Sequence, residues 1–183
     1  MMNLDDEIQY NKIYSRIKSA YPKFDVLEKE NSTFMKILNV FMIILSFGQN
    51  KEFLTKYITT IGYKIYVPEF WFRTPYHIRI EKLYHEAIHM EQRTRYGILF
   101  YPLYLLGLPF PIFFAYYRTK FEKEGYEATM QYHYKRYGEQ FFTTEYKNSI
   151  LEKFSSSGYL WMWMNKSSIE KWYDDFLKEM TSK

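Results

Sequence analysis

The sequence predicts an α+β fold that is mostly helical, with one small β element. Most of the 183 residues fall into segments with helical spacing and clear helix ends, and one segment, residues 57–67, is dense in β-branched and aromatic residues. The chain is long enough to bury a sizeable core and contains no internal repeat or linker-like segment. We therefore expect a single domain over residues 1–183, with a central part at 57–138 and helical flanks at 1–56 and 139–183.

Two helices are predicted in the amino-terminal flank. The first covers residues 5–20, and Ser32 suits the N-cap of a second one over residues 33–47. The run 37–47 in the second helix is apolar except for an asparagine and a serine, and it is too short to span a bilayer. We expect this run to be buried.

The β element is predicted as a strand, or as a hairpin bent at Gly62, that ends before Pro68. The next helix covers residues 75–96. Thr74 suits its N-cap, Pro75 suits its first position, and Gly97 can end it. Two arginines in its last turn interact favourably with the helix dipole.

This helix contains the motif His85-Glu86-Ala87-Ile88-His89, or HExxH. In a helix the spacing puts both imidazoles one turn apart on a single face, together with Gln92, and this is half of a zinc site. Glu86 follows the first ligand, where its carboxylate can act as general base on a metal-bound water. The alternative is a pair of core histidines that are hydrogen-bonded among aromatic side chains.

A hydrolytic zinc site usually needs a third protein ligand. Three glutamates compete for this role on a helix predicted from Arg118 to the stop at Gly138. Glu122 shares its face with apolar and small residues, which allow another backbone to approach closely. Glu124 and Glu127 share a face with lysine and glutamine, which is typical of a solvated surface. Glu122 is therefore the better ligand.

HExxH followed, tens of residues later, by a helix bearing Glu122-x-Glu124-Gly125-Tyr126 resembles the gluzincin group of zinc peptidases. The resemblance covers roughly residues 57–138, the expected metal-site core. It implies a zincin-like domain with the β element beside the HExxH helix, Glu86 as catalytic base, a peptide or protein substrate, and zinc as cofactor. The metal ligands that it implies are His85, His89 and Glu122.

The chain departs from the gluzincin pattern after the ligand glutamate. Tyr126 stands where many members have Asp or Asn, and Gly125 stands where alanine is usual. In those members the acidic or amide side chain can orient a ligand histidine by a hydrogen bond. Here that partner is unassigned, with Tyr126, His133 or a backbone carbonyl as candidates, and a tyrosine or His133 could also assist the oxyanion.

The β element has two possible roles. Small zinc peptidases of this group resemble the chain in having a strand just before the active-site helix, whose edge can pair with an extended peptide. The other role is that of an ordinary structural hairpin covering the helix layer.

Residues 97–117 contain no charged side chain and are long enough to cross a bilayer. However, Pro102, Pro109 and Pro111 interrupt a straight helix. A single crossing would also put the histidines and Glu122 on opposite sides of the membrane. We therefore expect an aromatic connector that is buried or forms an interface with a protein, with a membrane surface or, in an oligomer, with another copy.

Two helices are predicted in the carboxy-terminal flank. One covers residues 144–154, and the other begins at a capping box, Ser167-Ser168-Ile169-Glu170, and continues through Met180. The aromatic stretch 159–164 between them is expected to pack under the active-site layer or to line the substrate site.

Composition excludes several classes of function. The absence of cysteine leaves only nitrogen and oxygen ligands for a metal. The net charge is +4, the basic residues are dispersed, and there is no glycine-rich phosphate loop, so we expect no nucleic-acid partner. The chain begins with acidic residues and no early apolar core, so we expect no secretory signal and a cytoplasmic or particle-associated protein.

The sequence therefore predicts zinc-dependent peptide hydrolysis. One alternative is a non-enzymatic interaction or assembly protein, for example a component of a phage particle, in which the metal site is structural or vestigial. A second alternative is a membrane-associated metalloprotease.

Overall fold

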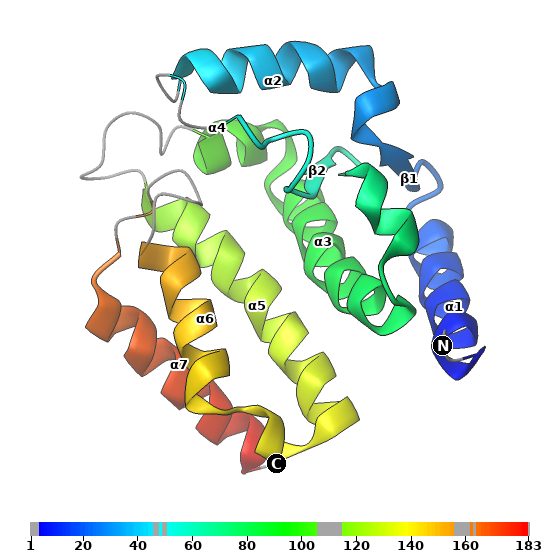
Figure 1. Cartoon of the computed structure of the whole chain (residues 1–183). Helices are drawn as coiled ribbons and strands as arrows, with labels where there is room; N and C mark the ends of the chain where they lie inside the picture. The colour runs from blue at the N-terminus through cyan, green and yellow to red at the C-terminus, as the bar shows by residue number, and fades with distance from the viewer. Residues whose placement is uncertain are drawn as a thin grey trace. The chain divides into compact units, whose positions relative to one another are not determined.

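The computed structural model describes residues 4–45, 48, 51–105, 115–155, 162 and 164–182. Within these residues the protein is mostly helical and has one three-stranded sheet (Figure 1), which confirms the predicted α+β class. The chain divides into two compact units, residues 1–90 and 91–183, and the boundary falls inside the continuous helix α3 (Tyr76–Tyr96). The single domain stays a prediction.

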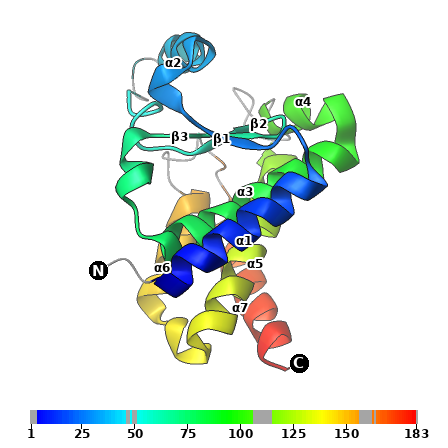
Figure 2. The same ribbon diagram turned by 90° about the vertical axis from the view of Figure 1, so that its right-hand side faces the viewer.

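The first unit contains the sheet. Its elements before α3 are α1 (Leu4–Ala20), β1 (Asp25–Glu28), the 3-10 helix η1 (Lys29–Asn31), α2 (Thr33–Leu45), β2 (Thr59–Ile61), β3 (Lys64–Val67) and the 3-10 helix η2 (Glu69–Arg73). Figures 1 and 2 show α2 on one side of the sheet and α1 and α3 on the other side.

The predicted hairpin is confirmed. Strands β2 and β3 pair in antiparallel fashion, and Gly62 between them has a φ of 64°, a conformation that favours glycine. β1 pairs with β3 in parallel, so the order is β1-β3-β2 and β2 lies at one edge. The sequence did not predict β1, because a four-residue segment with one acidic residue at each end carries little strand signal.

Helices α1 and α2 occupy the predicted ranges, and Ser32 caps α2 by accepting a hydrogen bond from Met35 N at 3.3 Å. The prediction that the run from Ile37 is buried is wrong for its described part. Among the α2 side chains whose burial is described, only Met35 and Met42 are buried, and five large apolar side chains are more than half exposed: Phe34, Ile37, Val40, Phe41 and Ile44. The composition of the helix is mostly apolar, and this composition did not decide which of its sides is buried.

Helix α3 ends at Tyr96 as predicted, and Gly97 after it has a φ of 59°. The first backbone hydrogen bonds of α3 are accepted by Pro75 O, one residue after the predicted N-cap Thr74. Its hydroxyl donates instead to Phe70 O at 3.0 Å, and the Arg79 guanidinium donates to Thr74 O at 2.7 Å. The buried arginine therefore ties η2 to the first turn of α3.

The second unit is helical in its described residues. Its elements after α3 are η3 (Gly97–Leu99), α4 (Phe100–Leu105), α5 (Ala115–Tyr137), η4 (Glu139–Phe141), α6 (Thr144–Ser155) and α7 (Lys166–Thr181). Helices α5, α6 and α7 lie side by side (Figure 1) around a buried core. That core consists of Tyr126, Met130, Ile150, Leu151, Phe154, Met162, Ile169 and Tyr173.

The predicted ends of the last helices need one correction. α5 ends before Gly138 and α6 begins at Thr144, as predicted. The capping box at Ser167 is wrong, because the N-cap of α7 is Asn165, whose side chain accepts from Ser167 N at 3.0 Å and from the Ser167 hydroxyl at 2.7 Å. Asparagine and serine are about equally good N-caps, so local preference did not decide between them.

Parts of two predicted segments lie outside the described residues. Of the uncharged stretch 97–117, residues 106–114 are not described, and these include Pro109 and Pro111. Pro102 lies in the first turn of α4, where a missing N–H is tolerated. Of the aromatic stretch 159–164, only residues 162 and 164 are described. No helix in the described part of the chain is both long and apolar enough to cross a membrane.

Candidate metal centre

Helix α3 carries both histidines of the HExxH motif on one face. Their ring centroids lie 5.0 Å apart, and their exposed fractions are only 8% for His85 and 6% for His89. Buried imidazoles need hydrogen-bond or metal partners, because burial removes the water that would otherwise solvate them.

Glu122 is the most buried of the three competing glutamates on helix α5, as predicted, but Glu124 and Glu127 are half-buried and hydrogen-bonded rather than solvated. Glu122 is 1% exposed and shares its buried face with Phe121 and Thr129. Glu124 accepts from Gln92 and from Arg95, and Glu127 accepts from Trp172 Nε1 at 2.7 Å. Burial raises the pKa of Glu127, and the hydrogen bond from Trp172 opposes that rise.

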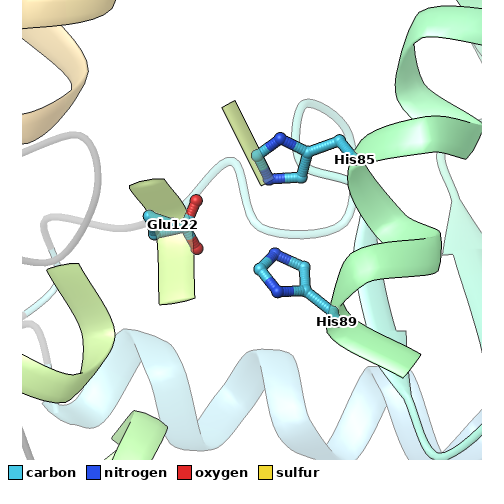
Figure 3. Close-up of side chains that lie close together, drawn as sticks. All are labelled: His85, His89 and Glu122. Carbon is cyan, nitrogen blue, oxygen red and sulfur yellow. The ribbon is translucent and has the colours of Figure 1, made fainter. Parts of the chain in front are cut away.

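Among the described residues, the structure contains one group that could hold a metal ion. It consists of His85, His89 and Glu122, all buried, and the ligand atoms that they offer lie within 4.8 Å of one another. Figure 3 shows the two imidazoles and the carboxylate pointing toward one another. Two nitrogen donors and one oxygen donor form the ligand set of many metal sites that keep an open coordination position.

The side chain of Gln92 joins the two helices that supply these ligands. It is fully buried, and its Nε2 donates to Phe121 O at 3.0 Å and to Glu124 Oε2 at 3.0 Å. Gln92 lies one turn after His89 on α3, and Phe121 immediately precedes Glu122 on α5. These bonds join the last turns of α3 to the part of α5 that carries Glu122.

Tyr104 on α4 contacts the third ligand directly. Its hydroxyl donates to Glu122 Oε1, and its ring stacks on Phe121 with 6.4 Å between centroids. The Arg118 guanidinium lies over the Tyr104 ring, 5.1 Å from its centroid. No sequence pattern distinguishes Tyr104, because a chain with 20 tyrosines gives no local signal for the one that helix packing brings to Glu122.

Glu86, the expected base, is held from the β2 side. It is 7% exposed, and its Oε2 accepts a hydrogen bond from Thr60 Oγ1 at 2.6 Å. Thr60 is the middle residue of the edge strand β2. The same strand that could bind an extended peptide therefore also orients the carboxylate next to the first histidine.

A buried lysine lies in the electrostatic environment of Glu86. Lys29 is fully buried, its Nζ donates to Phe53 O at 2.8 Å, and it lies 3.8 Å from the centroid of the Phe53 ring. Burial lowers the pKa of Lys29 to about 7, and the negative charge of Glu86 partly opposes that fall. No sequence pattern predicts the burial of Lys29, because nothing in its neighbours along the chain distinguishes it from an exposed lysine.

Tyr126 and His133, the two side-chain candidates for the hydrogen-bond partner of a ligand histidine, both lie on α5 and contact other residues of the second unit. Tyr126 packs against Phe154, with 5.4 Å between ring centroids. His133 Nδ1 is hydrogen-bonded to Tyr146 OH at 2.9 Å, and it lies about three turns, or about 16 Å, beyond Glu122 along α5. His133 is therefore too far from Glu122 to orient a ligand or assist an oxyanion at the same site.

The chain matches no protein-family model, and neither a curated protein nor a solved structure matches it. The gluzincin resemblance therefore depends on the HExxH motif and on the Glu122 segment alone. The function is therefore inferred from the geometry of these residues.

We expect the metal content of the protein to depend on Glu122 and not on Glu124. Glu122→Gln should lower metal affinity by about 100-fold or more, because a three-ligand site loses its anionic donor. Elemental analysis after dialysis against chelator-buffered metal gives the measurement. Glu124→Gln is the matched control, since it makes the same change two residues away on the same helix, and His85→Ala and His89→Ala should also lose the metal. Equal loss in both glutamine variants would show that the ligand assignment is wrong.

The free energy of unfolding should rise with pH above about 7 because of Lys29. The folded protein loses the Lys29 proton near pH 7, whereas the unfolded chain keeps it up to its ordinary pKa of 10.5. The unfolded state therefore binds more protons in this window, and stability increases by up to about 1.4 kcal/mol per pH unit.

Urea unfolding at pH 7, 8 and 9 measures this slope. Lys29→Met should flatten it, and Lys36→Met, a change of an exposed lysine on α2, should leave it as in the wild type. Equal slopes in all three proteins would contradict the pKa assignment.

Proposed function

We propose that the protein is a zinc-dependent peptidase of gluzincin-like type, with a zincin-like arrangement of its active-site helices. The observation that carries this proposal is the buried group of His85, His89 and Glu122, with Glu86 between the two histidines in the same helix. The imidazole–imidazole–carboxylate set suits zinc and leaves one coordination position for water.

The role of Glu86 follows from its contacts. Zinc bound by the three ligands would supply a Lewis acid and a water of lowered pKa. Thr60 holds Glu86 through Oε2, and the carboxylate so oriented would accept the proton of a water that attacks a scissile carbonyl. The Tyr104 hydroxyl, by donating to Glu122 Oε1, keeps the third ligand in one orientation.

The position of β2 supports a peptide as the substrate. β1 and β2 lie at the two edges of the sheet, and β2 carries the residue that contacts the base. An extended peptide that pairs with the outer edge of β2 would pass next to Glu86 without further rearrangement. Main-chain pairing of this kind gives affinity with little dependence on side chains.

The alternative is an interaction or assembly protein, for example in a phage particle, with a structural or vestigial metal site. The exposed apolar side of α2 gives the chain a surface apart from the metal centre, and monomeric proteins seldom expose such patches without a binding role. The membrane-associated protease combines this surface with an active site. Hydrolysis, or its absence, separates the enzyme from the assembly component.

Glu86→Gln should abolish peptide cleavage while leaving the metal content and the fold unchanged. The amide has nearly the same shape as the carboxylate and can still accept from Thr60, but it cannot take a proton from water. A broad peptide library with mass-spectrometric readout measures cleavage, and elemental analysis and circular dichroism give the controls. A wild type that binds zinc but cleaves nothing in the library would favour the assembly component.

Thr60→Val should lower kcat by roughly tenfold with little change in KM or metal content. The substitution removes the hydroxyl that orients Glu86, and a hydrogen bond to a charged group contributes about 1.5–3 kcal/mol. Thr60→Ser should restore most of the rate, because it keeps the donor.

Thr59→Val is the control for Thr60→Val, since neighbouring residues of a strand point to opposite faces of the sheet. Equal activity of Thr60→Val and the wild type would remove the orienting role but not the proposed hydrolysis.

A further inference from the structure

Helix α2 presents an apolar surface that the metal centre does not explain. Its exposed fractions are 53% for Phe34, 65% for Ile37, 57% for Val40, 55% for Phe41 and 67% for Ile44. We call these side chains the α2 face. Removing large apolar side chains from water is favourable, so a surface of this kind is expected to have a binding role.

The α2 face is continuous along the helix. At 100° per residue its side chains fall within an arc of about 120°, and the buried Met35 and Met42 lie on the other side. Lys36 is exposed at the margin of this arc. In Figures 1 and 2 the helix has the sheet on one side only within the first unit.

Helix α2 carries one charged side chain, Lys36, and no acidic residue. The nearest acidic residues along the chain, Glu30 and Glu52, lie before and after the helix, and Glu52 is paired with Lys56. Lysine at the margin of an apolar helix face can bury its aliphatic part and direct its ammonium group toward phosphate. This pattern complements an anionic lipid surface.

The size of the α2 face argues against a second copy as the occupant. Five side chains of this kind, each somewhat more than half exposed, present roughly 500 Å², whereas a stable protein interface takes about 800 Å² from each partner. The face also lacks the polar groups that supply interface hydrogen bonds. A lipid surface needs neither this area nor matched hydrogen-bond partners. The helix is about 20 Å long, too short to span a bilayer but long enough to lie in its plane.

We propose that the α2 face lies on the surface of a lipid bilayer that contains anionic headgroups. The five apolar side chains enter the boundary between headgroups and acyl chains, and Lys36 contacts lipid phosphate. The helix axis lies parallel to the membrane plane. This inference uses the first unit alone and does not depend on the proposed hydrolysis.

Vesicle flotation with the full-length protein tests the inference. Vesicles of phosphatidylcholine alone are compared with vesicles of phosphatidylcholine and phosphatidylglycerol. The wild type should float with the anionic vesicles, and the double variant Ile37→Glu/Phe41→Glu should bind at least tenfold more weakly. Both changed positions are exposed, so the fold should be kept. Lys36→Gln should weaken binding to anionic vesicles by about fivefold.

The matched control is Ile8→Glu on α1, a change at a 59% exposed isoleucine outside the α2 face, and it should bind like the wild type. Two results would overturn the inference. One is a wild type that does not float with anionic vesicles at low salt, or a double variant that floats equally well. The other is a wild-type dimer in sedimentation velocity that the double variant converts to monomer, because this would assign the face to a second copy.

Discussion

The buried amide of Gln92 is the interaction that joins α3 to α5 within the second unit. It donates to the carbonyl of Phe121, one residue before Glu122, and to Glu124 Oε2. A fully buried amide loses much of its solvation free energy if its partner is displaced.

Glu86, the proposed base, is positioned by contacts that do not involve the three proposed metal ligands. Thr60 holds Glu86 from the edge strand, and the buried Lys29 adds a positive charge whose protonation changes near neutral pH. The hairpin, η1 and α3 therefore act on one carboxylate from different parts of the first unit. This arrangement links the strand that is proposed to bind peptide to the residue that is proposed to activate water.

Burial was the property that sequence patterns predicted least well. The apolar run in α2 has the composition of a core helix, yet Ile37 and Ile44 are about two-thirds exposed. Conversely, Lys29 and Gln92 are fully buried although lysine and glutamine usually lie at the surface. In each case local composition was consistent with both environments, and the packing of other elements determined which one formed.

The sequence by itself predicted six of the described helices (α1, α2, α3, α5, α6 and α7), the hairpin at Gly62, and Glu122 as the most buried of the three competing glutamates. These features follow from short-range physics: helical periodicity, glycine at positive φ, and the alignment of His85 with His89 one turn apart. Only the tertiary structure decided that Tyr104 contacts Glu122, that Thr60 contacts Glu86, and that one face of α2 stays in solvent. These contacts join residues distant in the chain, and their free energies depend on how helices and strands pack together, which no local pattern encodes.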